Sequence, residues 1–256
     1  MKVSSTPEVL ISSTQVHFNH ASTFGIFGSD QTWKGLFINH LIKRLNFSSY
    51  LELGIGEGLT WEQVNCPFKV GVDIGNVKFV RLSREEIIDK FPETTTDDFF
   101  ASYDTNKKID IIYIDALHTK EQVKIDFFNS IDILSDNSIL ILHDINPPDE
   151  GSTSQHNSGD VFAFWIELCD NNSTHHFYTF KPPRDHSQFY PTNDASREDT
   201  VGIYIHNKEL KKSLKKDYQH NLDHSFAFFD EHREKYIKDR HIDVETLVDL
   251  IQDLNG

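Results

Sequence analysis

A short apolar segment that runs directly into a glycine-rich loop constrains the fold of this chain more than any other feature. Residues 50–53 (Tyr-Leu-Glu-Leu) are followed by Gly-Ile-Gly-Glu-Gly at residues 54–58. Glycines at alternate positions allow a tight turn and let a ligand approach the main chain without interference from a Cβ atom. In open α/β sheets, nucleotide-like ligands bind in the crevice at the carboxyl ends of the strands. The pattern therefore predicts an α/β fold with a ligand site after its first strand, although a bare turn is the alternative.

An acidic residue closes the next predicted strand, at residues 69–73. Asp73 is well placed there to accept hydrogen bonds from both hydroxyls of a ribose. The glycine loop and this carboxylate, at the right separation and in strand contexts, together predict binding of a nucleoside-type cofactor.

The rest of the chain alternates between strand and helix patterns. Residues 109–115 and 138–143 are nearly continuous in apolar residues, as expected of strands buried on both faces of a parallel sheet. Apolar residues recur at helical spacing after Ser29 and Asp30, which resemble a helix N-terminus, and the helix should end near residue 46. We expect a Rossmann-like, doubly wound, seven-stranded and mostly parallel sheet, with residues 177–180 and 201–205 forming its last, antiparallel pair.

Three regions are expected along the chain. Residues 1–28 form an N-terminal arm or lid, residues 29–207 the cofactor-binding domain, and residues 208–256 a helical extension that packs on the sheet or on a second subunit of a homo-oligomer. A polar loop of about fifteen residues follows Asp144, and loops of that length inside a domain are usually functional. Asp160 is a plausible N-cap for the helix that begins after it.

The composition excludes several classes of function. The formal net charge of −15 repels phosphate backbones, so nucleic acid is not expected as a partner. Two isolated cysteines give neither a disulfide framework nor a zinc pattern. No segment approaches the roughly 20 apolar residues that span a bilayer, and none resembles a signal peptide. We therefore expect a cytoplasmic protein that does not bind membranes.

The spacing and charge of the glycine loop distinguish between two cofactors. The dinucleotide fingerprint requires a third glycine at position 59, where this chain has Leu59. Glu52 and Glu57 would also repel a pyrophosphate, whereas carboxylates suit a cofactor that carries an ammonium and a sulfonium. The electrostatics favour S-adenosylmethionine (SAM) over NAD.

These motifs resemble those of class I SAM-dependent methyltransferases. A narrower similarity lies in IDIIYIDALHTKEQVKID and in NSIDILSDNSILILHDINPP. These stretches resemble the branch that carries an I-D-G-x-H element and a later H-D or D-D pair, which includes macrocin and sugar O-methyltransferases (methyltransferase family 24). Ala116 stands where that element usually has glycine, and the first crossover helix must be short. The resemblance covers about residues 48–206.

The resemblance implies roles for residues on the cofactor side. The loop glycines would wrap the methionine and ribose portions of SAM: Gly54, Gly56 and Gly58. Glu52 would lie near the amino-acid end of the cofactor, and Asp73 would hold its ribose. Asp97 would lie near the adenine edge.

The resemblance also implies an acceptor side formed by Asp115, His118, His143 and Asp144. Each histidine is a candidate general base, because a histidine near neutrality can take the proton of a hydroxyl as the methyl moves. Relatives that use a divalent ion hold it where this chain has Asp115 and Asp144, and oxygen ligands suit Mg²⁺. The adjacent ligand position is Ile145 here, so both a metal site and acceptor binding without metal stay open.

The function predicted from the sequence is SAM-dependent methyl transfer, to oxygen on a sugar or another small polar molecule. Two alternatives remain: a SAM- or nucleoside-binding module without activity, and an NAD-linked oxidoreductase, which Leu59 and Glu57 oppose.

Overall fold

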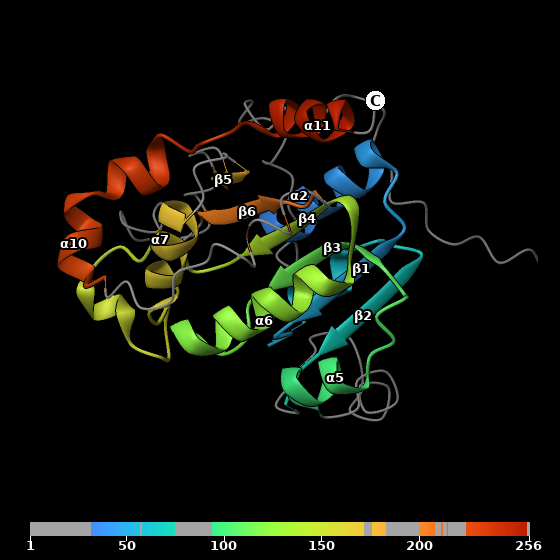
Figure 1. The fold of residues 1–256 in the computed structure, drawn as a ribbon, viewed down its shortest axis with the longest axis horizontal. Coiled ribbons are helices and arrows are strands. Elements are labelled where there is room, and N and C mark those ends of the chain that lie inside the picture. The colour runs from blue at the N-terminus through green and yellow to red at the C-terminus, as the bar shows by residue number, and fades with distance from the viewer. Residues whose placement is uncertain are drawn as a thin grey trace, which may run out of the picture.

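Six strands form one sheet in the computed structural model, which describes residues 32–56, 58–74, 94–171, 176–182, 200–207, 211, 214 and 224–254. In chain order they are β1 (Ser49–Leu53), β2 (Phe68–Val72), β3 (Ile109–Ile114), β4 (Leu134–Leu142), β5 (Phe177–Phe180) and β6 (Val201–Ile205). Their order across the sheet is β2-β1-β3-β4-β6-β5 (Figure 1). Strands β1 to β4 are parallel, and β6 is antiparallel to both of its neighbours.

This topology confirms the predicted Rossmann-like, mostly parallel sheet with an antiparallel last pair. The described residues contain six strands, against the seven expected. The chain runs outward from β1 to β2 and then returns to β3 on the other side of β1. In open α/β sheets, ligands bind beyond the carboxyl ends of the strands at such a reversal, which here lies between β1 and β3.

Helices cover both faces of the sheet (Figure 1). One face packs against α6 (Lys120–Ile133), α7 (Val161–Asn171) and α10 (Phe226–Glu231). The other face packs against α2 (Trp33–Leu45), α3 (Leu59–Gln63) and α11 (Val244–Asp253). The short α5 (Thr96–Ser102), the 3₁₀ helix η1 (Glu150–Thr153) and the π-helical turn η3 (Glu234–Lys238) lie in the connections. As predicted, the first crossover helix, α3, is short, with five residues.

The central strands supply side chains to both cores. On β3, Ile111 and Tyr113 join the core beneath α2 and α11, whereas Ile112 and Ile114 join the core beneath α6 and α7. Successive side chains of a strand point to opposite faces, so a strand covered on both faces must be apolar throughout. This requirement explains the uninterrupted apolar character of the segment.

The start of the first described helix differs from the prediction. Helix α2 begins at Trp33, and Thr32 is its N-cap, with a side chain that accepts a hydrogen bond from the N–H of Gly35. Ser29 and Asp30, which we expected at this terminus, lie outside the described residues. The helix ends as predicted at Asn46, whose φ of 54° is left-handed and closes the last turn.

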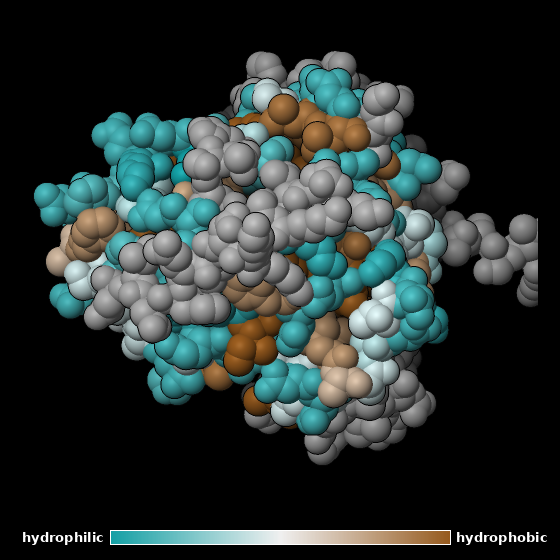
Figure 2. Space-filling model, viewed as in Figure 1, coloured by the Kyte–Doolittle hydropathy of each residue, from teal (hydrophilic) through white to brown (hydrophobic). Residues whose placement is uncertain are grey.

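The C-terminal helices pack on the sheet of the same chain. The buried face of α11 joins the core beneath α2: Val244, Leu247, Val248 and Ile251. Glu245 of α11 forms an ion pair with Arg44 of α2. Figure 2 shows a largely hydrophilic surface on this side of the molecule, with hydrophobic residues gathered at the upper edge, over α11. The predicted N-terminal arm, residues 1–28, lies outside the described residues.

Candidate active site

The glycine loop leaves the end of β1 in a backbone conformation that only glycine adopts easily. Gly54 has a φ of +82°, and its N–H donates to the carbonyl of Val72 in the neighbouring strand. A Cβ atom at Gly54 would lie 2.1 Å from the carbonyl oxygen of Asp115. Gly56 and Gly58 also have positive φ, and Gly58 is the N-cap of α3. The first glycine thus allows the loop to pass against the backbone that follows β3.

The carboxylate of Asp73 ties this loop to the end of the second strand. Its Oδ2 accepts hydrogen bonds from the N–H of Ile55 at 2.9 Å and from the N–H of Gly56 at 3.1 Å. The glycine loop and Asp73, which the sequence predicted to act together, are therefore adjacent in space. The structure adds a role for Asp73 that the sequence did not suggest, because the carboxylate fixes the loop in addition to any ribose contact.

Glu52 is buried beneath the loop, with 2% of its surface exposed. Its Oε2 accepts a hydrogen bond of 2.6 Å from the hydroxyl of Tyr50. Burial raises the pKa of the Glu52 carboxyl to about 8, because desolvation outweighs the hydrogen bond from Tyr50. A carboxyl with this pKa carries its proton at neutral pH.

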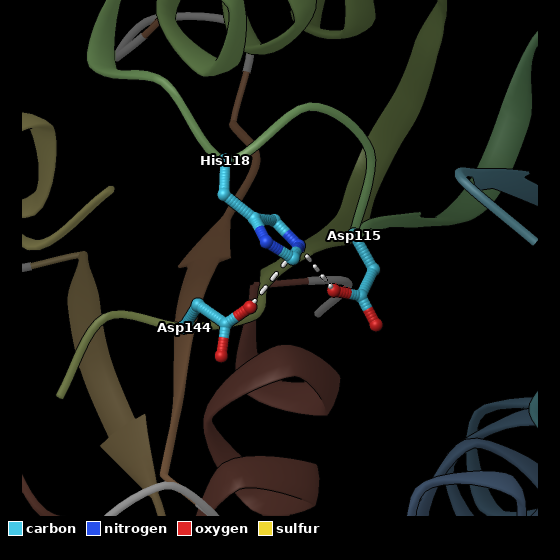
Figure 3. Close-up of side chains that lie close together, drawn as sticks. All are labelled: Asp115, His118 and Asp144. Carbon is cyan, nitrogen blue, oxygen red and sulfur yellow. Dashed lines mark ion pairs between the residues drawn. The ribbon is translucent and has the colours of Figure 1, made fainter. Parts of the chain in front are cut away.

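Four side chains meet at the carboxyl ends of β3 and β4. Asp115 directly follows β3, and His118 lies three residues further on, in the loop before α6. His143 and Asp144 directly follow β4, and the two strands are neighbours in the sheet. Figure 3 shows the imidazole of His118 pointing between the carboxylates of Asp115 and Asp144. The predicted acceptor-side residues are thus brought together.

The contacts among these four groups form a closed ring of alternating charge. His143 Nδ1 lies 2.9 Å from Asp115 Oδ1 and 3.1 Å from Asp144 Oδ2. His118 Nε2 lies 3.4 Å and 3.2 Å from the same two oxygens. Each imidazole therefore faces both carboxylates, and each carboxylate uses one oxygen for both imidazoles.

The other oxygen of Asp115 contacts a residue that sequence reasoning missed. Lys34 of α2 places its Nζ 3.5 Å from Asp115 Oδ2, and the hydroxyl of Tyr113 donates to the same oxygen at 3.3 Å. A single lysine in an amphipathic helix carries no sequence signal of such a role. Only the packing of α2 across the sheet reveals it.

These neighbours shift the protonation equilibria of the ring. Burial alone would raise the pKa of the Asp115 carboxyl, but the charges of His143 and Lys34 and hydrogen bonds from both imidazoles hold it well below its usual range. Burial lowers the pKa of His143, but the two carboxylates overcome this effect and raise it to about 9. The pKa of His118 is also raised, because its contacts with Asp115 and Asp144 outweigh desolvation.

A divalent cation fits part of this ring. Ligand atoms of Asp115, His118 and Asp144 all lie within 4.8 Å of one another. Because one donor is an imidazole, the set is better suited to Mn²⁺ or a similar transition ion than to Mg²⁺, which prefers oxygen alone. Binding would require His118 to lose its proton.

Asn146, two residues after Asp144, faces other partners. Its Oδ1 accepts from the guanidinium of Arg233 at 2.5 Å, and its Nδ2 donates to Thr200 at 3.2 Å. The side chain is therefore engaged by the protein rather than pointed at the ring.

Two further predicted residues lie apart from this ring. Asp97 is exposed in the first turn of α5. The carboxylate of Asp160 accepts from the N–H of Lys120 at 2.5 Å, so it binds a backbone N–H in the first turn of α6, whose N-cap is Thr119, rather than one of α7. The expected capping role was thus assigned to the wrong helix, because the loop folds back across the start of α6.

Comparison with known proteins gives a family match over the centre of the chain. Residues 69–145 match the model of methyltransferase family 24, described as a methyltransferase domain. The search of curated proteins finds no match. Within the described residues, no helix combines the length and the apolar character needed to cross a bilayer.

Solved structures of low sequence identity also align with the chain. A putative O-methyltransferase from Klebsiella pneumoniae has 13% identity and a TM-score of 0.49, over 72% of this chain and 83% of that one. A putative caffeoyl-CoA O-methyltransferase from Staphylococcus aureus has 17% identity and a TM-score of 0.46, over 68% and 83%. An O-methyltransferase from Bacillus cereus, solved with S-adenosylhomocysteine (SAH), has 13% identity and a TM-score of 0.47, over 70% and 84%.

The family match confirms the class predicted from the sequence. The fold is Rossmann-like, residues 69–145 match a methyltransferase domain, and the glycine loop and the polar ring lie at the same edge of the sheet.

Proposed function

We propose that this protein transfers the methyl group of SAM to a hydroxyl oxygen of a small polar acceptor, such as a sugar. The main support is the ring of Asp115, His118, His143 and Asp144 beside the glycine loop. The N–H of Asp115 donates to the carbonyl of Leu53, the last residue of β1, so the two parts of the site are in direct backbone contact. A cytoplasmic location and the absence of nucleic-acid and membrane partners stay predictions.

On the cofactor side, the loop and its acids match the chemistry of SAM. Gly54, Gly56 and Gly58 would pass along the methionine and ribose portions, and Asp73 would bind the ribose while it holds the loop. Glu52 would face the cationic amino-acid end. Asp97 would lie toward the adenine, at the start of α5; the N–H of Thr94, two residues before this helix, donates to the carbonyl of Asp73.

On the acceptor side, His118 would bind the hydroxyl and take its proton as the oxygen attacks the methyl carbon. The C–S bond of the sulfonium breaks in the same step, and SAH leaves as a neutral thioether. The protein's contribution is the alignment of oxygen, carbon and sulfur, together with removal of one proton. Asp115 and His143 would hold His118 in place through the ring.

The same residues would hold a metal ion if the enzyme uses one. Asp115, His118 and Asp144 would be its protein ligands. A bound divalent ion would lower the pKa of an acceptor hydroxyl and orient it. In that case His143, which contacts both carboxylates, would act as the base only after losing the proton that its pKa of about 9 retains at neutral pH.

Substitution of His118 tests the acceptor side. His118→Ala should lower the rate of SAH formation about 100-fold or more, the usual contribution of a general base, and should leave SAM affinity unchanged. The assay follows methyl transfer from radiolabelled SAM to a panel of sugars and other polyols, with and without Mn²⁺ or Mg²⁺. His232→Ala, which removes a histidine from the end of α10, is the control and should retain the full rate.

The assay also separates the proposal from its alternatives. If the unmodified protein binds SAM in calorimetry but forms no SAH with any acceptor, it is a binding module. Binding of NAD in place of SAM would favour the oxidoreductase. Full turnover by His118→Ala would contradict the assignment of the base.

The buried carboxyl of Glu52 predicts a pH dependence of SAM binding. A cationic cofactor binds better to the ionised carboxylate of Glu52. Because the pKa of this carboxyl is about 8, it must lose its proton for SAM to bind below that pH. We expect affinity to rise between pH 5.5 and 7.5, by up to about tenfold per pH unit. Glu52→Gln should bind SAM more weakly and with a flat profile. An equally steep profile in Glu52→Gln would show that another group is responsible.

Glu52 predicts a pH dependence of stability of the opposite sign. The folded protein holds a proton on this carboxyl from pH 4.5 to about 8, whereas the unfolded chain does not. The contribution of Glu52 to the free energy of unfolding should therefore fall as the pH rises through this window. The difference between the original protein and Glu52→Gln, in urea denaturation at several pH values, measures it.

A further inference from the structure

A guanidinium from the C-terminal region reaches the loop that follows β4. Arg233, which lies between α10 and η3, donates from Nη1 to the side chain of Asn146 at 2.5 Å and to the carbonyl of Pro147 at 2.9 Å. Its Nη2 donates to Asp230 at 2.8 Å, and the guanidinium lies 4.6 Å from the ring centre of Phe229. The planar fork of an arginine suits this set of partners, which a lysine could not satisfy together.

The loop that Arg233 contacts carries one of the two carboxylates of the active site. Asp144 has a φ of +58°, in the left-handed region that residues other than glycine rarely adopt. The surrounding structure must therefore hold it, and the hydroxyl of Ser158 donates to its Oδ1 at 3.2 Å. Asn146 lies two residues further on and is buried, with 5% of its surface exposed.

The far end of the same loop contacts His118. The N–H of Asp160 donates to the carbonyl of His118 at 3.3 Å. A Cβ atom at Gly159 would lie 1.6 Å from this carbonyl oxygen, so the two backbones are in close contact. Residues 144–160 thus contribute Asp144 at one end and support His118 at the other.

We propose that Arg233 is a positioning residue that holds the loop of residues 144–160 so that Asp144 and His118 meet. The proposal rests on the methyl-transfer function given above. Arg233 and Asn146 both lie outside the residues that match the methyltransferase domain, 69–145. Under this proposal, the C-terminal region helps to position the residues of the active site.

Direct binding of an anionic acceptor by Arg233 fits the structure less well. Its side chain is only 14% exposed, and its nitrogens already donate to Asn146, Pro147 and Asp230. Asp230 supplies the negative charge that an anionic substrate would otherwise bring. The contacts of Arg233 thus lie within the protein and link two of its segments.

Arg233→Ala and Asn146→Ala test the proposal. Each should lower kcat by about 10- to 100-fold, since misplacement of catalytic groups by an ångström has effects of this size, and each should leave the Kd for SAM unchanged. In hydrogen exchange, residues 144–160 should lose protection in both variants. The kcat of Arg233→Lys should lie between those of Arg233→Ala and the original protein. The double variant should lose less kcat than the product of the two single effects predicts, because both changes remove the contact between Arg233 and Asn146.

Arg240→Ala is the matched control. Arg240 also belongs to the C-terminal region, but it donates to the carbonyls of Phe177 and Cys169, in β5 and α7. This variant should lose stability and keep its kcat and the protection of residues 144–160. An equal loss of kcat in Arg240→Ala, or additive effects of the Arg233 and Asn146 changes, would overturn the proposal.

The exchange measurement needs no acceptor. If methyl transfer itself is the wrong function, the original protein forms no SAH, yet Arg233→Ala still exposes the loop. If Arg233 does not position the loop, the original protein forms SAH and residues 144–160 stay protected from exchange in Arg233→Ala.

Discussion

Asp115→Asn should abolish methyl transfer and lower the free energy of unfolding by about 1 to 3 kcal/mol, because it removes the carboxylate shared by several partly buried charged groups. Asp115 contacts His118, His143 and Lys34 together. An asparagine keeps the shape of the side chain but removes the charge that balances these groups. The ring then has one carboxylate for two imidazoles and a nearby ammonium.

The loss of stability should depend on pH in a direction that the pKa values set. His143 has a pKa of about 9 in the folded protein, above its ordinary 6.5. Its interaction with Asp115 therefore stabilises the fold fully below pH 6.5 and is lost as the pH rises through 9. The difference between Asp115→Asn and the original protein should be larger at pH 7 than at pH 10, in urea denaturation at both values.

Asp110→Asn is the matched control for this experiment. Asp110 lies on the same strand, but at its opposite end, where it accepts hydrogen bonds from the backbone of Ser48 and Ser49. Its substitution should cost less stability and leave methyl transfer intact. Retained activity in Asp115→Asn, or a stability difference that does not change between pH 7 and pH 10, would contradict the role of the ring.

Gly54→Ala should destabilise the fold by about 3 kcal/mol, the upper range for an extra methyl in a packed interior. The added Cβ would meet the carbonyl oxygen of Asp115 at 2.1 Å and the Cα of Ala116 at 2.5 Å. Both are backbone atoms at the end of a central strand, so they cannot move aside cheaply. The φ of +82° adds strain for any residue with a side chain.

Gly56→Ala separates ligand contact from folding. Gly56 also has a positive φ, of +53°, but a Cβ there meets nothing within 4 Å. This variant should lose only about 1 kcal/mol of stability. If SAM passes along this loop, its affinity should nevertheless fall at least tenfold in calorimetry. Unchanged SAM binding by a folded Gly56→Ala protein would place the cofactor elsewhere.

The elements that could be predicted are those with local causes. The apolar run of β3 reflects burial on both faces, and the glycines after β1 reflect a turn that a side chain would obstruct. The end of α2 was readable because Asn46 tolerates the left-handed conformation that terminates a helix. The start of α2 was placed wrongly, since several polar residues near it are acceptable caps and only packing selects Thr32.

The active site was predictable only in part. Parallel strands bring their carboxyl ends to one edge, which is why Asp115 and His143 could be expected near Asp73 from their positions alone. The roles of Lys34 and Arg233 come from helices far away in the sequence, and no local pattern marks them. Asp160 was assigned to the wrong helix for the same reason.

By itself, the sequence determined the order of the described strands, the glycine loop after β1 and the match of residues 69–145 to a methyltransferase domain, because these depend on short-range patterns of hydrophobicity, glycine and charge. Only the tertiary structure decided how the acids are used. Burial raises the pKa of Glu52 to about 8, and the convergence of two loops brings Asp115 and Asp144 against both imidazoles. Protonation and pairing depend on distances between segments remote in the chain and on their shared exclusion of water, which no local stretch of residues contains.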